Sequence, residues 1–517
     1  MTGVDKPAVP PRAVVEALAD VQGVCGRPVV ARVTDNESGE TQLVPIPCGS
    51  TRESVCKACA ERARRLRAHQ CREGWHLAVE PAPSAGPADA EADDDAPVGE
   101  DDGCDRRVRS TRRRQDMPDL PRLPMEDRTV GRVFESPDGK VYRPSMFLTL
   151  TLPSYGKVDG DGVPVDPATY DYRRAALDAM HFAKLVDRFW QNLRRCAGYQ
   201  VQYFASVEGQ RRGAPHLHAA VRGAIPRQVI RDVVAATYHQ VWWPPHEVPP
   251  CDDVVWVDDL GELEPTMAGE GGYVEAATGW VLPTWEEALN DVDGQFSPDA
   301  EPGHVVRFGT QIDIQGLIAG TPATDKAVGY LTKYLTKDLG EALAADLDSD
   351  DGRAAAREAH LDRLAEETRW LPCSPTCTNW LRYGTQPKGA RPGMVPGHCP
   401  GKAHRRENLG VGGRRVLVSR RWTGKTLTEH RADRAAVVRA TLEEAGIDPD
   451  DHGELSVSGT DGRWSWETIA RTQVDDATYL AAVAALVRTR DRWRQQYDEA
   501  KVRAAEASSV SATPGGP

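Results

Sequence analysis

Two short stretches of the sequence carry residue types that could act together on a nucleic-acid strand. Gly213-Ala-Pro-His-Leu-His218 holds two histidines two positions apart, and Tyr330-Leu-Thr-Lys-Tyr334 holds two tyrosines four positions apart. Imidazoles can hold a divalent ion, and a phenol beside such an ion can attack a phosphodiester. The phosphotyrosine formed would conserve the bond energy, so the cut strand could be rejoined without ATP.

The histidines would share one face of a strand, because alternate side chains of a strand point the same way. Glu208 ends the preceding predicted strand and is placed to join His216 and His218 across a hairpin. Two imidazoles and one carboxylate leave positions open for a phosphate oxygen, which suits Mg²⁺ or Mn²⁺. The alternative is a pair of surface histidines without a ligand, which is the commoner case for an isolated His-x-His.

The tyrosines would share one face of a helix, because positions four apart are neighbours there. Lys333 and Lys337 form a second such pair. A phenol is a poor nucleophile because its pKa is about 10, and a nearby cation stabilises the phenolate. Either lysine is therefore a candidate to assist the phenol or the phosphate. The alternative is that Tyr330 and Tyr334 only pack on an amphipathic helix.

Most of the cysteines fall into two clusters. The chain has eleven, and the first residues lack the apolar stretch of a secretory signal, so metal ligation is expected rather than disulfides. Structural zinc is the expected ion, because each set looks complete with four ligands. The two sets are Cys25, Cys48, Cys56 and Cys59, and Cys373, Cys377, Cys399 and His404.

Some of these ligands have competitors nearby in the sequence. Cys71 and His69 compete for a place in the first set, and His398 competes with His404 in the second. Reduced cysteines without any metal are the alternative for both sets.

Alternating strands and helices must position these residues. Hydrophobic periodicity and turn residues predict an α+β domain with an antiparallel sheet. The expected strands are 145–152, 200–207, 216–221 and 305–314, and the expected helices are 172–196, 230–242 and 324–339.

Composition divides the chain into five parts. Few apolar residues occur between 81 and 114, so no core can form there and a disordered linker is expected. The expected parts are a cysteine-rich zinc module at 1–80, the linker at 81–130, a catalytic domain at 131–345 with an acidic insertion at about 244–303, a second zinc module with a basic region at 346–440, and a helical region with a tail at 441–517.

The net charge of −13 is unevenly distributed over 517 residues. Acid gathers at 93–95, 100–102 and 252–301, whereas arginine pairs and triplets recur from 106 to 421. Local positive surfaces matter more for phosphate binding than the total charge does. DNA therefore stays a candidate partner.

Two other classes of protein are disfavoured. No run of about eighteen apolar residues occurs, so we expect a cytoplasmic protein without a membrane span. Thr423-Gly-Lys-Thr426 resembles the end of a phosphate-binding loop, but Ser419 stands where that motif requires glycine. We therefore expect no helicase motor in this chain, and a host helicase would have to supply one.

Three stretches in a fixed order resemble the HUH endonucleases (histidine–hydrophobic–histidine) of rolling-circle replication. They are Phe147-Leu-Thr-Leu-Thr151, Gly213-Ala-Pro-His-Leu-His218 and Tyr330-Leu-Thr-Lys-Tyr334. The two-tyrosine form is similar to that of the replication initiators of small isometric phages.

The wider chain resembles the replication initiators of actinobacterial plasmids and integrative elements. This similarity spans most of residues 25–440. It is carried by Cys48-Gly-Ser-Thr-Arg-Glu-Ser-Val-Cys-Lys-Ala-Cys59, Leu381-Arg-Tyr-Gly384, Leu409-Gly-Val-Gly-Gly-Arg-Arg-Val-Leu-Val-Ser419 and Trp422-Thr-Gly-Lys-Thr426.

The resemblance implies an HUH nuclease domain, with the histidines central on an antiparallel sheet and the tyrosine helix beside it. It also implies nicking of one strand at a plasmid double-strand origin, which leaves a 3′-OH for a polymerase. His216 and His218 would hold Mg²⁺ or Mn²⁺ with Glu208 as a third ligand, and Tyr330 and Tyr334 would be the nucleophiles. Implied partners are single-stranded and duplex origin DNA and the host helicase and polymerase.

Two rival functions remain open at this point. A conjugative relaxase or a single-strand transposase shares the histidine pair and the tyrosine chemistry. A zinc-dependent DNA-binding regulator without catalysis would need only the cysteine clusters.

Overall fold

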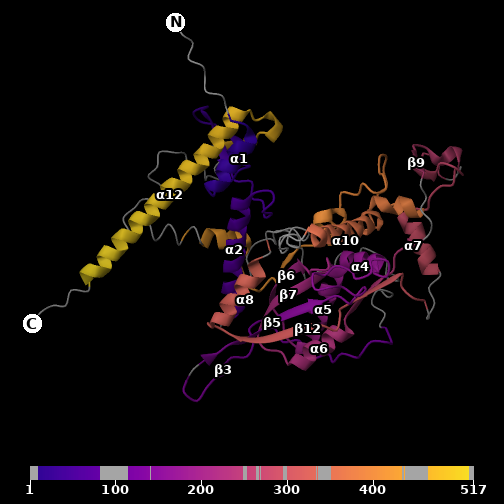
Figure 1. The fold of residues 1–517 in the computed structure, drawn as a ribbon, viewed down its shortest axis with the longest axis horizontal. Helices are drawn as coiled ribbons and strands as arrows, with labels where there is room; N and C mark the ends of the chain where they lie inside the picture. The colour runs from indigo at the N-terminus through magenta and orange to yellow at the C-terminus, as the bar shows by residue number, and fades with distance from the viewer. Residues whose placement is uncertain are drawn as a thin grey trace, which may run out of the picture. The chain divides into compact units, whose positions relative to one another are not determined.

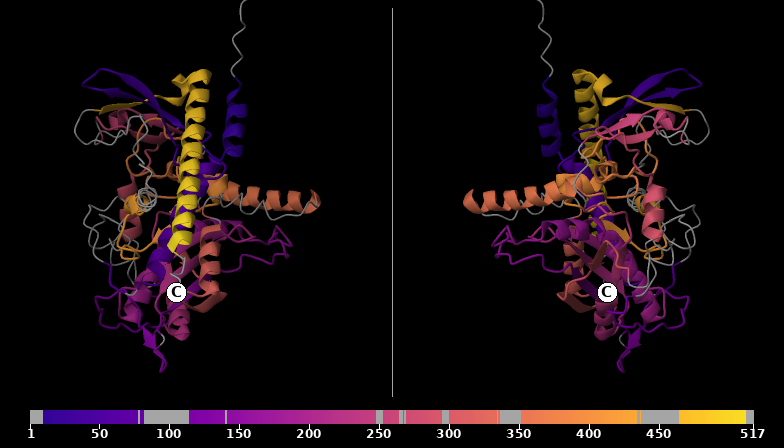
Figure 2. Two further views of the ribbon diagram at one scale, coloured as in Figure 1. Left: turned by 90° about the vertical axis from the view of Figure 1, so that its left-hand side faces the viewer. Right: turned by 90° about the vertical axis from the view of Figure 1, so that its right-hand side faces the viewer.

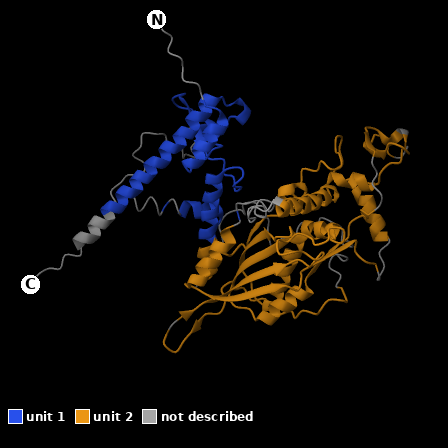
Figure 3. Ribbon diagram, in the orientation of Figure 1, with its two compact units in different colours: residues 1–70, 335–337, 425–517 blue, residues 71–334, 338–424 orange. Residues whose placement is uncertain are grey.

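The structure, a computed structural model, combines helices and strands (Figure 1). It describes residues 10–77, 79–81, 114–139, 141–247, 253–263, 267, 269–294, 300–333, 335, 351–433, 436 and 464–511. The chain forms two compact units, which Figure 3 colours separately. Unit 1 comprises residues 1–70, 335–337 and 425–517, and unit 2 comprises residues 71–334 and 338–424.

A five-stranded sheet forms the centre of unit 2. Its strand order is β12-β5-β7-β6-β13, and each neighbouring pair is antiparallel. Strand β7 is therefore central and is paired on both edges. The strands are β5 (Pro144–Thr151), β6 (Tyr203–Gly209), β7 (Pro215–Arg222), β12 (Ile312–Ile318) and β13 (Val416–Val418).

The two faces of this sheet differ in chemistry because side chains alternate along each strand. Leu148 and Leu150 on β5, with Leu217 and Ala219 on β7, belong to the main apolar core. The same core contains residues of α5 (Phe182–Ala197) and α6 (Arg227–Ala236). The opposite face, which we call the histidine face, therefore carries the alternate residues of these strands.

The remaining elements of unit 2 lie outside this sheet. They are β3 (Phe134–Glu135), β4 (Val141–Tyr142), α4 (Tyr172–Met180), β8 (Tyr238–Val241), β9 (Val254–Val257), η1 (Leu260–Glu262), β10 (Gly272–Glu275), α7 (Trp285–Gly294), β11 (His304–Arg307), α8 (Pro322–Lys333), α10 (Asp351–Trp370), η3 (Thr378–Tyr383), η4 (Lys402–His404) and η5 (Arg406–Asn408).

The acidic insertion packs onto the segment that holds the second cysteine cluster. Trp285 on α7 lies against Trp380, with 5.0 Å between ring centroids. The Tyr273 hydroxyl on β10 donates to the Arg391 carbonyl at 2.9 Å. These contacts give the insertion a structural role in unit 2.

The expected helix over 172–196 is two helices. His181 is both the C-cap of α4 and the N-cap of α5, and its backbone angles are φ −97° and ψ 4°. Its backbone leaves helical geometry while its side chain stays buried. Apolar periodicity continues through the break, and for that reason the sequence predicts a single helix.

Two other predicted elements change type within their length. The helix expected over 230–242 ends at Ala236, where Thr237 adopts extended geometry and β8 begins. The strand expected over 305–314 is divided between β11 and β12, which belong to different sheets. Gly309 lies in the division, where a Cβ atom would come within 2.8 Å of the Leu152 carbonyl oxygen.

Part of the linker expected at 81–130 belongs to the described residues. Residues 82–113 lie outside the described part of the chain, but residues 114–130 are described. Thr129 is fully buried, and its backbone N–H donates to the Glu80 carboxylate at 2.7 Å. Ordered structure therefore starts earlier than residue 131.

Unit 1 contains segments from both ends of the chain. Strand β1 (Val29–Asp35) pairs with β2 (Thr41–Ile46) and with β14 (Trp464–Thr468), all antiparallel. We expected only helices and a tail after residue 441, so β14 is a difference. Helices α1 (Arg12–Val21) and α12 (Asp476–Ser511) share an apolar core, and Figure 2 shows the two helices near each other.

Helix α2 (Lys57–Trp75) carries Cys59 of the first cysteine cluster in its first turn, and η6 (Arg471–Gln473) precedes α12. Among the described residues, none of the helices combines the length and the apolar character that crossing a membrane requires.

Candidate active site

The register of the central strands brings Glu208, His216 and His218 together. His216 on β7 lies opposite Glu208 on β6, and His218 lies opposite Ser206 on β6 and Thr149 on β5. One donor atom from each of Glu208, His216 and His218 lies within 4.8 Å of the others. Because directly opposed residues share a face, all these side chains lie on the histidine face.

Hydrogen bonds orient the His218 ring. Its Nδ1 lies 3.0 Å from the Thr149 hydroxyl, and its Nε2 lies 3.3 Å from the Tyr330 hydroxyl and 3.7 Å from Glu208 Oε2. When Nδ1–H donates to Thr149, the Nε2 lone pair points towards the carboxylate. Such a contact selects the tautomer in known histidine metal sites.

Burial keeps both imidazoles neutral near pH 7. It lowers the pKa of His216 to about 4 and that of His218 to about 3. Burial also raises the pKa of Glu208 to about 7, against a hydrogen bond from Ser206 and the charges of Arg415 and Lys333. A buried carboxyl beside neutral imidazoles gains from a cation, which would hold it in the ionised form.

One unpaired nitrogen and the donor set of this group fit a metal ion. His216 Nδ1 is buried and has no hydrogen-bond partner. A buried nitrogen without a partner is costly unless a ligand uses its lone pair. The three donors, two imidazole nitrogens and one carboxylate, are a set that binds divalent ions with positions left open.

Tyr330 reaches this group from helix α8. Its ring meets the His218 ring edge to face, at 4.9 Å between centroids and 89° between planes. The Tyr330 side chain is 43 % exposed, so a substrate can approach its hydroxyl. Lys333 ends the same helix and lies close enough to influence Glu208. Tyr334 and Lys337 lie outside the described residues.

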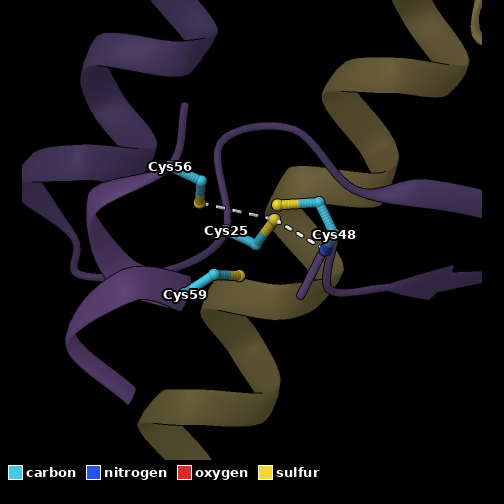
Figure 4. A group of neighbouring side chains, drawn as sticks. All are labelled: Cys25, Cys48, Cys56 and Cys59. Carbon is cyan, nitrogen blue, oxygen red and sulfur yellow. Dashed lines mark hydrogen bonds between the residues drawn. The ribbon is translucent and has the colours of Figure 1, made fainter. Parts of the chain in front are cut away.

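The first cysteine cluster lies in unit 1, where four thiols converge (Figure 4). The Cys56 and Cys25 sulfurs are 3.8 Å apart, and the Cys48 N–H donates to the Cys25 sulfur at 3.3 Å. Tetrahedral zinc with Zn–S bonds of about 2.3 Å places sulfurs about 3.8 Å apart. The structure groups Cys59 with these three, whereas Cys71 and His69 are not in the group.

The second cluster lies in unit 2, where Cys373, Cys377, Cys399 and His404 converge. His404 Nδ1 lies 2.7 Å from the Thr368 carbonyl, and its Nε2 lies 3.4 Å from the Cys377 sulfur. The Thr368 contact therefore turns Nε2 towards the thiols. His398, its competitor, is exposed and outside the group.

Little space is left for a side chain at Gly401, beside this second cluster. A Cβ atom at Gly401 would lie 3.0 Å from the Cys373 sulfur and 3.4 Å from that of Cys399. The chain must therefore pass close to the ligands without a side chain.

Two residues that support the site, Thr149 and Ser206, were not predicted from the sequence. Thr149 orients His218, and the Ser206 hydroxyl donates to Glu208 Oε1 at 3.0 Å. A polar residue inside each apolar strand was the available signal. Only the pairing of distant strands shows that Thr149 and Ser206 flank His218.

Comparison with known proteins adds an independent line of evidence. A replication initiator protein of Streptomyces ambofaciens is 29 % identical to the chain over 232 residues. That alignment covers 38 % of this chain and 42 % of the relative, so the chain spans less than half of the relative's length. No solved structure matches. The family described as "Replication initiator protein, pSAM2" (RepSA) matches residues 12–485, which is most of the chain. The protein therefore belongs to this family of replication initiators.

Proposed function

We propose that the protein starts rolling-circle replication by nicking one strand at a plasmid origin and later rejoining it. Membership of the replication initiator family supports the biological role. The observation that carries the chemistry is the Tyr330 hydroxyl, 3.3 Å from His218 Nε2 beside Glu208 and His216. A nucleophile of this kind next to a metal-ligand set suits phosphoryl transfer.

The proposed reaction exchanges one phosphate ester for another. The Tyr330 oxygen forms a bond to phosphorus, and the bond between phosphorus and the 3′ oxygen of the strand breaks. The phenol loses one proton and the leaving 3′ oxygen gains one, so protons and electrons balance. The 3′-OH then serves a polymerase as primer, and the reverse attack rejoins the strand.

Glu208, His216 and His218 would hold Mg²⁺ or Mn²⁺, which would supply a Lewis acid for the phosphate oxygen. The chain's own residues do the rest. Thr149 and Ser206 hold the donors in place, and Lys333 adds positive charge near the phosphate. Tyr334 would be the second nucleophile, and the two tyrosines would alternate between initiation and termination.

A covalent adduct tests this proposal. The full chain is incubated with Mn²⁺ and single-stranded DNA from its own origin, and denaturing gels detect a 5′-phosphotyrosyl product. Replacing both Tyr330 and Tyr334 by Phe should abolish the adduct, while each single change leaves partial activity. Tyr497→Phe is the control, because that tyrosine is also exposed and lies in unit 1.

The rival functions give different outcomes. An adduct from the double variant would show that another residue is the nucleophile. A non-catalytic DNA-binding regulator would bind duplex DNA and form no adduct. A relaxase or transposase would form the adduct at a transfer origin or an element end, without supporting plasmid replication.

We also propose that each cysteine cluster holds a structural zinc ion. The sulfur spacing and the absence of an open ligand position support this assignment. The purified chain should contain about two zinc ions by elemental analysis. Cys377→Ser should remove about one of them and destabilise unit 2, whereas His398→Ala should change neither zinc content nor stability. A full zinc complement in Cys377→Ser would contradict the second site.

A further inference from the structure

A pocket of about 550 Å³ opens at the end of the central sheet. Three segments build it: the end of β5 with the loop that follows, the β6–β7 hairpin, and the connection from β11 to β12. Its lining residues are Thr151–Pro153, Ser154, Gly156, Val158–Gly160, Gly162, Gln210–Arg212 and Phe308–Gln311.

The pocket adjoins the candidate active site through β5 and β6. Thr151 lines the pocket, and in the sheet it lies opposite His216, on the histidine face. Gln210 lines it from the hairpin, two residues after Glu208. A DNA strand whose phosphate lies at Glu208, His216 and His218 would therefore have the pocket directly beside it.

Hydrogen bonds hold the pocket walls together. The Arg212 guanidinium donates to the Leu152 carbonyl at 2.7 Å and to Gln210 Oε1 at 2.9 Å. The Thr151 hydroxyl donates to the Gln311 carbonyl at 2.9 Å. The hairpin and the β11–β12 connection are thus both tied to β5, so the walls are in place before any ligand arrives.

The lining suits a nucleobase better than a phosphate. Leu152 and Phe308 supply apolar surface, and Thr310 and Gln311 supply polar groups. Arg211 and Arg212 also line the pocket, but their guanidiniums already donate to the backbone carbonyls of Gly160, Pro153 and Leu152, and Asp159 adds a negative charge. The volume lies within the range of about 300–1,000 Å³ that is usual for small ligands.

We propose that this pocket binds one unpaired base of the nicked strand, next to the phosphate that is cut. The inference rests on the proposed function, because it assumes that the strand crosses the metal-ligand group. A base must leave its stack to enter such a pocket, which single-stranded DNA allows at low cost. The pocket would then select the nucleotide beside the cut and so contribute to origin recognition.

Gly160 offers a way to fill the pocket. A Cβ atom there would meet nothing within 4 Å, and its backbone is outside the left-handed region. Gly160→Trp should therefore fold and occupy the opening. Gly294 has the same open surroundings at the end of α7, outside the pocket, so Gly294→Trp is the matched control.

Binding without cleavage tests the proposal. Single-stranded oligonucleotides from the origin, each lacking one base, are titrated with the full chain in a chelator-free buffer without added Mg²⁺ or Mn²⁺. The wild-type chain should lose about tenfold or more in affinity at one position beside the cut, as expected for one stacked base. Gly160→Trp should bind the intact strand about tenfold more weakly and lose its sensitivity to that position, while Gly294→Trp should behave as wild type.

The opposite results would overturn the inference. Folding of Gly160→Trp is checked by circular dichroism, and Gln311→Ala, a smaller change in the same lining, should reduce the same sensitivity. A folded Gly160→Trp that keeps wild-type affinity or sensitivity excludes a base in the pocket. The Mn²⁺ adduct assay is separate: base-dependent binding without any adduct would contradict the proposed function and leave the pocket assignment standing.

Discussion

Two groups of histidines in unit 2 share a chemical environment and differ in what surrounds their nitrogens. Burial lowers the pKa of His216 and His218 on the sheet, and also that of His181 and His239 beside α5 and β8. In the first group a carboxylate and Tyr330 converge on the rings.

In the second group the neighbours are other rings. His181 lies 4.7 Å from the Trp243 ring and 5.7 Å from the His239 ring, measured between centroids. The nearby carboxylate, Asp178, pairs with His304 instead, with 2.7 Å between Asp178 Oδ1 and His304 Nε2. Among the described residues, neither His181 nor His239 belongs to a group whose donor atoms converge. Burial of a neutral histidine is therefore not enough to form a candidate metal site. A carboxylate must also converge on the ring nitrogens.

The largest expected difference between the groups concerns catalysis. His218→Gln should slow adduct formation about a thousandfold, because losing a metal ligand removes several kcal/mol of charge stabilisation. His239→Gln should stay within about threefold of wild type, a difference of under about 1 kcal/mol. Gel-based adduct rates at saturating DNA measure both.

Thermal unfolding with added Mn²⁺ provides a second measurement of the same difference. Mn²⁺ should raise the midpoint of the wild-type chain and of His239→Gln, because an ion bound only to the folded state stabilises it. The midpoint of His218→Gln should not respond. An equal Mn²⁺ response in His218→Gln and His239→Gln would show that the two groups of histidines do not differ in metal binding.

A smaller effect should come from the residue that orients the ligand. Thr149→Val removes the hydroxyl beside His218 Nδ1 and keeps the shape of the side chain. We expect the Mn²⁺ concentration for half-maximal adduct formation to rise about 10- to 100-fold, as for other outer-shell contacts. Thr149→Ser keeps the hydroxyl and should restore most of the affinity. A wild-type Mn²⁺ response in Thr149→Val would mean that Thr149 only packs there.

The smallest effect should appear as pH dependence of stability at His181. Burial holds its folded pKa well below the ordinary 6.5, with the charges of His239, His304, His246 and Lys184 acting in the same direction. As pH falls below about 6.5 the unfolded chain takes up the proton first, so the folded state loses stability. Between pH 7.5 and 5.5 this loss amounts to about 1.4 kcal/mol for one histidine.

His181→Phe should lack this part of the decline. Urea unfolding followed by tryptophan fluorescence at both pH values compares the variant with wild type, and a constant loss of stability cancels in the difference. The same decline in both chains would show that His181 is already protonated, or solvated, in the folded state.

Local patterns predicted much of the central sheet. Alternation in β7 placed Leu217 and Ala219 on the face opposite His216 and His218, and the short β6–β7 hairpin placed Glu208 beside the histidines. These features depend on residues near each other in the chain. The break at His181 was not predicted, because its apolar neighbours continue the helical pattern on both sides.

The sequence by itself determined which residue types recur at chemically useful spacings: His-Leu-His, Tyr-x-x-x-Tyr and the cysteine pairs. It left open the choice between His404 and His398, because His398 directly precedes Cys399 and His404 follows it by five residues. The tertiary structure decided that choice through the Thr368 carbonyl, which lies 36 residues away in the chain. It likewise set Thr149 against His218 and Tyr330 within reach of the same ring. Contacts between such distant segments depend on strand register and helix packing, and local periodicity carries no information about either.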